Sequence, residues 1–87
     1  GRYRVKAQMA VDAFNEAFSC AFDEHTAHTV GGQIVNYLGR VPRRNESMEL
    51  NGLLFRVLRA DNRRLYTLMV EDLRPQPADE ATESHAT

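Results

Sequence analysis

Three side chains between positions 20 and 28 have the chemistry of metal ligands, or of a nucleophile and its base. They are Cys20, His25 and His28, and Cys20 is the single cysteine among 87 residues. A structural zinc site uses four ligands, usually in closely spaced pairs, whereas these three are unevenly spaced. A catalytic Cys–His pair needs an orienting third group and oxyanion donors, and neither is evident. We therefore expect solvated histidines and a buried thiol, with no catalytic residue.

Carboxylates are the candidate ligands for magnesium, which prefers carboxylate oxygens and keeps several waters. The candidates are scattered along the chain: Asp23, Glu24, Glu46, Asp61 and Asp72. No spacing among them predicts a cluster, so the sequence predicts no metal site.

A glycine pair opens a helical segment and is the candidate cofactor-binding motif. The motif consists of Thr29, Val30, Gly31 and Gly32. Free N–H groups at a helix start hold phosphate or carboxylate groups, while glycines also allow one backbone to approach another closely. A nucleotide-hydrolase loop would continue with Lys and Ser or Thr, but Gln33 and Ile34 follow here. Close packing and anion binding are the two interpretations of this motif.

Arginines supply most of the positive charge, which is concentrated between positions 40 and 64. They are Arg40, Arg43, Arg44, Arg56, Arg59, Arg63 and Arg64. Such a patch is either simply solvated or contacts an anionic partner, namely a protein surface, lipid headgroups or nucleic acid. Alternation places Phe55 and Tyr66 on the apolar face, away from the arginines, so no base-stacking platform is expected. We predict no nucleic-acid binding and take Arg40, Arg43, Arg44, Arg63 and Arg64 as the candidate partner-binding residues.

Length and composition indicate one globular domain, because 43% of the residues are hydrophobic and 26% are charged. One cysteine cannot form an internal disulfide, so the core must hold without a cross-link. No apolar run approaches the length of a membrane span. The sequence begins at Gly1 without a signal peptide, and we interpret it as part of a longer chain.

The first half of the sequence predicts a strand and two helices. Residues 2–6 alternate between polar and apolar, which is typical of a half-buried strand. Val11, Phe14 and Phe18 then recur at helical spacing. Thr29 is a suitable N-cap and Gly39 a suitable C-cap for a second helix over residues 30–38.

The second half predicts a three-stranded antiparallel meander over residues 47–50, 53–60 and 65–71. Asn51-Gly52 is a strong type I′ hairpin signal, and Asp61-Asn62 marks a second tight turn. The predicted fold is therefore α+β, with both helices on one face of a sheet that the first strand joins. The predicted core contains Val11, Phe14, Phe18, Ile34, Leu38, Phe55, Val57, Leu68 and Val70.

After Leu73 the sequence offers few apolar residues to bury. Prolines, small residues and acids continue to Thr87. We therefore predict a folded domain over residues 1–73 and a disordered tail over residues 74–87.

The order and spacing of four stretches resemble the CorC/HlyC transporter-associated domain. The stretches are Phe14-Asn15-Glu16, Thr29-Val30-Gly31-Gly32, Gly39-Arg40-Val41-Pro42, and Phe55-Arg56-Val57-Leu58 through Asp61-Asn62-Arg63-Arg64-Leu65. The resemblance covers residues 1–72, nearly the whole predicted fold. No single motif is decisive, but their ordered set is specific.

The resemblance implies an α+β domain similar to part of the FAD-binding domain of certain oxidoreductases. Family members follow paired CBS domains and a transmembrane domain in bacterial proteins linked to magnesium and cobalt efflux, some of them called hemolysins. The resemblance therefore implies a non-enzymatic regulatory domain at the cytoplasmic side of the inner membrane. Its partners would be the CBS and transmembrane domains of its parent, with an anionic membrane surface as a further possible contact. No cofactor is expected. The alternative function is a module that senses flavin adenine dinucleotide or an adenine nucleotide at the Gly31-Gly32 helix start.

The chain departs from the family pattern at two positions. His28 stands where many relatives carry an acidic residue before the Thr-Val-Gly-Gly motif, which removes a potential carboxylate ligand. Asn45 stands where glycine is common, and asparagine also tolerates a positive φ.

Overall fold

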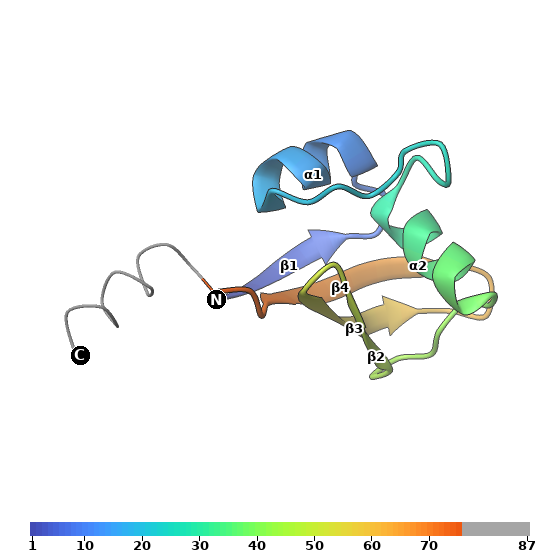
Figure 1. Cartoon of the computed structure of the whole chain (residues 1–87). Helices are drawn as coiled ribbons and strands as arrows, with labels where there is room; N and C mark the ends of the chain where they lie inside the picture. Colours follow the sequence, from blue (N-terminus) through green and yellow to red (C-terminus); the bar gives the residue numbers. More distant parts are fainter. Residues whose placement is uncertain (76–87) are drawn as a thin grey trace.

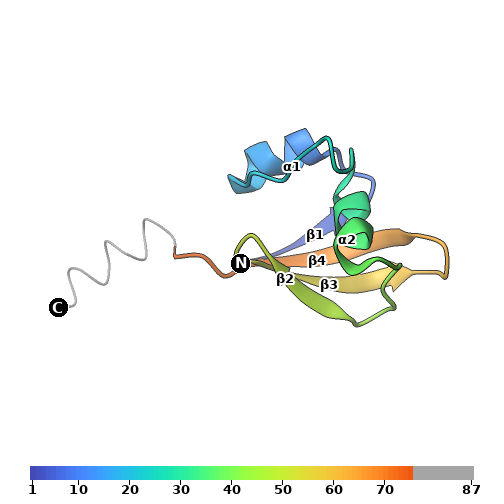
Figure 2. The same cartoon turned by 45° about the vertical axis from the view of Figure 1, so that its right-hand side comes forward.

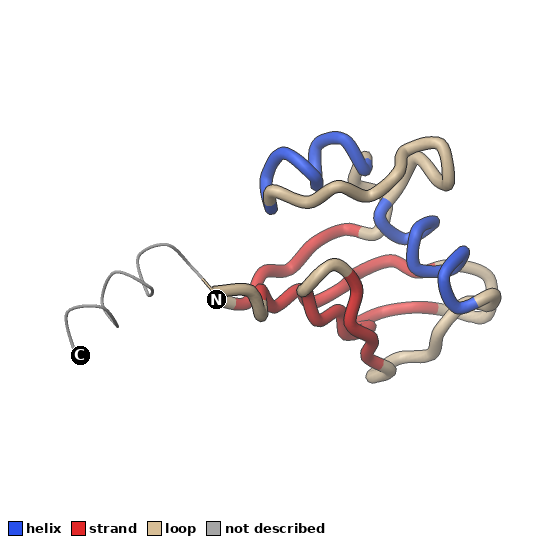
Figure 3. Tube along the Cα trace, in the orientation of Figure 1, coloured by secondary structure: helices blue, strands red, loops and turns tan. Residues whose placement is uncertain are grey.

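The computed structural model describes residues 1–75 and shows the predicted order of strands and helices (Figures 1 and 3). The elements are β1 (Arg2–Lys6), α1 (Val11–Phe18), α2 (Val30–Leu38), β2 (Ser47–Leu50), β3 (Leu53–Ala60) and β4 (Leu65–Asp72). The predicted bounds of β1, α2, β2 and β3 are confirmed, and β4 extends one residue beyond its predicted end.

The four described strands form one antiparallel sheet in the order β1-β4-β3-β2. The meander is thus confirmed, and β1 joins it by pairing with β4, from Arg2 opposite Glu71 to Lys6 opposite Thr67. Both helices lie over the same face of the sheet, as two views show (Figures 1 and 2). Among residues 1–75, no helix covers the opposite face, which we call the open face.

The predicted caps and turns have the backbone conformations that their residues favour. Thr29 accepts a hydrogen bond from the Gly32 N–H at 3.1 Å, and Gly39 ends α2 with φ of 76°. Asn51 and Gly52 both have positive φ, 52° and 77°, as a type I′ hairpin requires. Asn45 has φ of 73°, so asparagine occupies the left-handed conformation expected at that position.

The core lies between the helices and the sheet and is centred on aromatic rings. Phe14 and Phe55 are fully buried with ring centroids 5.9 Å apart, and Phe22 contacts both rings from the loop after α1. Phe18 and Leu38 are half-buried at the edge of the core, and the other predicted core residues are buried. The buried hydrophobic cluster also contains residues that the prediction omitted, namely Val5, Ala7, Val30, Leu53 and Leu65.

The prediction that Tyr66 lies on the apolar face is wrong. The pairing of β3 with β4 shifts register between Val57 and Ala60, so simple alternation fails there. Leu65 is buried instead, while the Tyr66 hydroxyl donates to Asp61 at 2.6 Å and the Arg59 guanidinium lies 5.1 Å from the Tyr66 ring. Tyr66 therefore does lie among the arginines, contrary to one premise of the argument against nucleic-acid binding.

Side-chain amides hold the loop between the helices. Asn15 accepts from the Phe22 N–H at 3.0 Å and donates to the Phe22 carbonyl at 2.9 Å. The buried Gln33 side chain donates to the carbonyls of Asp23 and Ala27 at 2.6 and 3.0 Å. Because these bonds satisfy loop backbone groups, a segment without regular structure packs against both helices.

Arg74, the first residue assigned to the tail, contacts the end of α1. Its guanidinium donates to the carbonyls of Phe18 and Ser19, the latter at 2.9 Å, and pairs with Asp72 at 3.0 Å. A cation suits the last carbonyls of a helix, where the helix dipole is negative. The described fold thus includes Arg74, and residues 76–87 of the predicted tail lie outside the described residues.

Within residues 1–75, neither helix has the length and apolar composition that crossing a membrane requires.

Candidate functional site

The N–H groups at the start of α2 all have partners within the protein. Val30 donates to the Met9 carbonyl at 3.0 Å and Gly31 to the Ala7 carbonyl at 2.8 Å. Gly32 donates to the Thr29 hydroxyl at 3.1 Å, and Gln33 donates to the Thr29 carbonyl at 3.0 Å. An anion at this helix start would have to displace one of these bonds, because anion binding there depends on free N–H groups.

Gly31 lets α2 approach the end of β1 closely. A Cβ atom at position 31 would lie 2.8 Å from the Ala7 Cβ and 3.1 Å from the Ala7 carbonyl oxygen. A Cβ atom at position 32 would lie 2.9 Å from the Ala27 Cβ. Both glycines therefore meet close neighbours, which favours the packing interpretation of the motif over the anion-binding one.

A shallow pocket brings the glycine motif close to two of the candidate arginines. It has a volume of about 340 Å³, and Thr29, Gly31 and Gly32 line one side while Arg63 and Arg64 line another. The sequence placed these groups more than 30 residues apart, and the β3–β4 turn brings them together. This volume lies near the lower limit for small-molecule sites, which are about 300–1,000 Å³.

Arg40 forms an ion pair that closes the connection between α2 and β2. Its two terminal nitrogens donate to the Glu46 carboxylate at 2.9 and 2.6 Å, and the Arg43 N–H donates to the same carboxylate. The hydrogen bonds from Arg40 and then from the Arg43 backbone lower the pKa of Glu46 from 4.5 to about 2. Within the part of the chain that the structure describes, Arg40 is thus the candidate arginine that is already paired with a carboxylate.

Replacing Glu46 with glutamine is expected to lower the urea midpoint at neutral pH but not near pH 2. Because folding lowers the Glu46 pKa, its contribution to stability is complete above pH 4.5 and is lost as the pH falls towards about 2. Urea unfolding across this range would show the two midpoints converging. The matched control is Glu49→Gln on β2, where the side chain is exposed. An equal Glu46→Gln deficit at every pH would contradict the assignment.

The β3–β4 turn is held by Asp61, which leaves two arginine side chains free to extend outward. Asp61 accepts from the backbone N–H groups of Arg63 and Arg64 at 2.7 and 2.8 Å and from the Tyr66 hydroxyl. The Tyr66 bond and then the two backbone bonds lower the pKa of Asp61. The turn therefore uses the backbones of Arg63 and Arg64, not their guanidinium groups.

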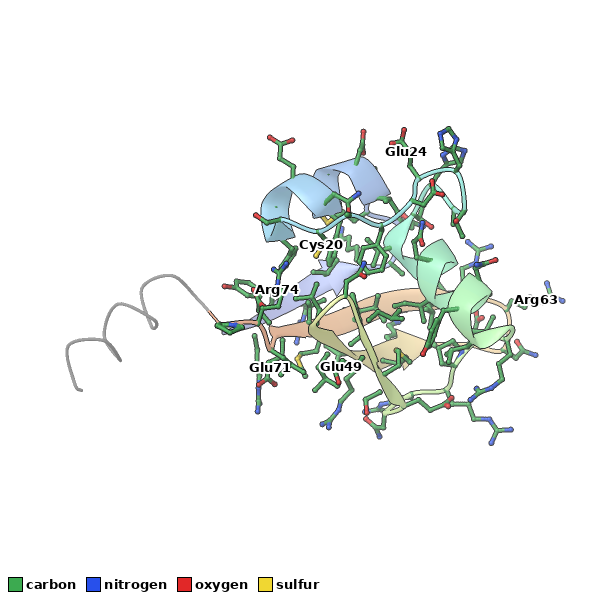
Figure 4. All side chains as sticks on the ribbon, viewed as in Figure 1. Cys20, Glu24, Glu49, Arg63, Glu71 and Arg74 are labelled. Atoms are coloured by element: carbon green, nitrogen blue, oxygen red, sulfur yellow. The ribbon has the colours of Figure 1, made fainter. Side chains whose placement is uncertain are left out.

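Four exposed arginines lie in two connections, the one that follows α2 and the one that joins β3 to β4. Arg43 and Arg44 lie in the α2–β2 connection, and Arg63 and Arg64 lie in the β3–β4 turn; we call this set the basic end. Figure 4 shows Arg63 extending from this end. Within residues 1–75, none of the four side chains takes part in an ion pair. Arg56 and Arg59 lie elsewhere, on the β3 strand.

Cys20, His25 and His28 do not form a site together. Both histidines are exposed, whereas Cys20 is half-buried and its pKa is raised by burial. Among residues 1–75, no three His, Cys, Asp or Glu side chains come close enough to share a metal ion.

Residues 1–74 match the family model CorC_HlyC, described as a transporter associated domain. The magnesium and cobalt efflux protein CorC of Escherichia coli K12 is 35% identical over 77 residues, which is 86% of this chain and 26% of that protein. CorC of Vibrio cholerae serotype O1 is 35% identical over 68 residues, which is 78% of this chain and 23% of that protein. The chain thus spans about a quarter of the length of these curated relatives.

Solved structures show the same fold. The magnesium and cobalt transporter-associated region from Neisseria meningitidis MC58 has a TM-score of 0.80 and 39% identity, covering 82% of this chain and 88% of that chain. A CorC_HlyC domain of a Xylella fastidiosa Temecula1 hemolysin, solved in complex with Mg²⁺ and Mn²⁺, has a TM-score of 0.75 at 20% identity, covering 85% and 90%. The family match over residues 1–74 confirms the resemblance: the chain belongs to the CorC_HlyC family of transporter-associated domains.

Proposed function

We propose that this chain is a non-catalytic regulatory domain of a CorC-type magnesium and cobalt efflux protein. Its basic end would contact the CBS or transmembrane domains of the parent, at the cytoplasmic side of the inner membrane. The proposal follows from the family match and from relatives named as efflux proteins that are about four times longer. In this arrangement the domain biases ion transport without carrying out chemistry.

The observation that carries the proposal is the absence of ion-pair partners for the four arginines of the basic end within residues 1–75. A cluster of like charges costs self-repulsion in the isolated domain, and an anionic neighbour relieves it. Charge complementarity of this kind orients partners and discriminates between them. Anionic lipid headgroups near the parent offer the same complementarity.

Replacing Arg63 and Arg64 together with serine in the intact parent is expected to change cation efflux by about fivefold or more, a typical coupling between sites. The isolated domain should keep its stability within about 0.5 kcal/mol, because the turn depends on Asp61 and on backbone N–H groups. Efflux of magnesium or cobalt from cells and thermal unfolding of the domain are the two measurements.

The matched control is the Arg63→Lys and Arg64→Lys double variant, which keeps both charges. If the partner recognises charge, this variant should retain most of the cation efflux of the unchanged parent. Unchanged efflux in the serine variant, with normal expression of the parent, would show that the basic end does not act in transport.

The ligand-sensing alternative has less support. Flavin adenine dinucleotide or an adenine nucleotide would bring phosphates to the start of α2, but the N–H groups of Val30, Gly31 and Gly32 already have protein partners. The pocket beside them, with Arg63 and Arg64 on its wall, is the place where such a ligand would have to bind.

A further inference from the structure

Among residues 1–75, the strand β1 lies at one edge of the sheet and pairs with a neighbour on one side only. The Ala7 N–H donates to the Tyr66 carbonyl at 2.9 Å, so the odd-numbered residues of β1 direct their backbone groups towards β4. The even-numbered residues Arg2, Arg4 and Lys6 therefore direct theirs towards the free edge. The Lys6 carbonyl already accepts from the Met9 N–H at 3.0 Å. A short row of backbone donors and acceptors thus remains along β1.

A large groove follows this same edge. Its volume is about 1030 Å³, at the upper limit of the usual range for a small-molecule site, so it also has room for side chains of a peptide segment. The lining residues come from β1, from α1 and the segments that flank it, and from the end of β4, where Arg74 reaches the end of α1 (Figure 4). Because Arg4, Val5 and Lys6 all line it, the groove includes both faces of the strand and so runs along its edge.

The two sides of the groove differ in chemistry. On the helix side it is apolar: the Tyr3 ring, which is 50% exposed, meets the Phe18 ring at 5.2 Å, and Val5 and Met9 lie nearby. On the open face β1 presents three cations, Arg2, Arg4 and Lys6, because side chains alternate along a strand. Arg2 pairs there with Glu71, which points away from the helices.

We propose that the free edge of β1 binds an extended segment of another protein in which acidic and apolar residues alternate. The segment would add a fifth strand to the sheet through backbone hydrogen bonds to Arg2, Arg4 and Lys6. Its apolar side chains would enter the groove beside Tyr3 and Phe18, and its acidic side chains would face the three cations. Strand addition takes affinity from the backbone and specificity from alternate side chains.

The same charges disfavour a second copy of this chain as the occupant. Antiparallel pairing of two β1 strands about Arg4 would place Arg4 opposite Arg4 and Arg2 opposite Lys6. Like charges directly opposite each other are destabilising across a strand pair. Charges on an edge strand commonly prevent such self-pairing. Gln8 lines both the groove and the pocket beside Arg63 and Arg64, but the strand edge and the basic end use different side chains. The β1 edge can therefore bind a strand whether or not the basic end acts in transport.

The test uses a short fluorescent peptide in which glutamate and valine alternate. Fluorescence anisotropy measures its binding to the full chain, and NMR measures the chemical shifts of the β1 amides. We expect binding, with shifts of the Arg2, Arg4 and Lys6 amide signals. Arg4→Pro should weaken it by about tenfold or more, because proline removes an outward N–H while the bonds to β4 remain. Should Arg4→Pro not fold, methylation of the peptide's own edge-facing amides tests the same hydrogen bonds.

Charge reversal supplies the matched control. Arg4→Glu should lower the affinity for the glutamate–valine peptide by about fivefold and raise the affinity for a lysine–valine peptide. Arg44→Glu in the basic end should leave both affinities unchanged. Equal affinity for the two peptides, or binding insensitive to Arg4→Pro and to amide methylation, would overturn the proposal. So would a dimer of the free chain that Arg4→Pro abolishes. Binding to anionic lipid vesicles, lost in Arg4→Glu, without peptide binding would assign the surface to a membrane and also overturn it.

Discussion

Replacing Phe55 with alanine is expected to lower the free energy of unfolding by about 3 kcal/mol or more, as large core truncations do. Phe55 is fully buried in the middle of the sheet, and its ring contacts those of Phe14 and Phe22 at 5.9 and 6.2 Å. The three rings come from β3, α1 and the loop between the helices, so the cavity would open where the layers meet. That loss is a large share of the total stability of a small domain.

Urea unfolding of the variant and of the unchanged chain would measure this loss. Tyr37→Ala is the matched control, because Tyr37 is an aromatic residue of α2 that is 60% exposed. Its removal should cost far less than that of Phe55, since it leaves no cavity. A Phe55→Ala loss below about 1 kcal/mol would mean that the layers do not pack around this ring.

The arrangement of the elements could be predicted because local signals and hydrophobic periods agree along the chain. Thr29 and Gly39 mark the two ends of α2, and Asn51-Gly52 marks the β2–β3 hairpin; each adopts the conformation that its residue type favours. The place of β1 followed from a different argument, that a lone strand needs a partner. Its pairing with β4 confirms that argument.

Prediction failed where the geometry depends on the register between strands. Side-chain alternation counted back from Leu68 places Tyr66 on the apolar face. The register shifts near Arg59 instead turn Leu65 into the core and leave Tyr66 beside Asp61. Alternation breaks at Val57-Leu58 and at Leu65-Tyr66, but two adjacent apolar residues do not show which of them the register turns inward. Arg74 was assigned to the tail for a similar reason: composition cannot show that a side chain reaches back to the end of α1.

The candidate site was predictable as a set of residues but not as a geometry. The seven arginines were evident from the sequence, yet they divide by contacts that spacing does not encode. Arg40 pairs with Glu46 and Arg59 lies over Tyr66, whereas the four arginines of the basic end have no ion-pair partner within residues 1–75. The glycine motif was identified as a helix start, but its satisfied N–H groups were visible only in the structure.

Replacing Gly31 with alanine is expected to lower the free energy of unfolding by about 1–3 kcal/mol, the usual cost of overpacking a closely packed site. The new Cβ would lie 2.8 Å from the Ala7 Cβ and 3.1 Å from the Ala7 carbonyl oxygen. Neither atom can rotate away, because the Ala7 N–H is bonded to Tyr66 and its carbonyl to the Gly31 N–H. Gly31→Val would add two more methyl groups and cost more, so any ligand binding lost in that variant would follow from misfolding.

A size-exchange experiment separates packing from ligand binding at this position. Ala7→Gly removes the methyl group that the new Cβ would meet, so Gly31→Ala should cost less in the Ala7→Gly background than in the unchanged chain. Urea unfolding of the single and double variants gives the coupling directly, and residues in contact typically couple by about 0.5–3 kcal/mol. If Gly31 instead serves a bound anion, Gly31→Ala should leave the unliganded domain stable, and the Ala7 background should make no difference. Additive costs would therefore contradict the packing role of Gly31.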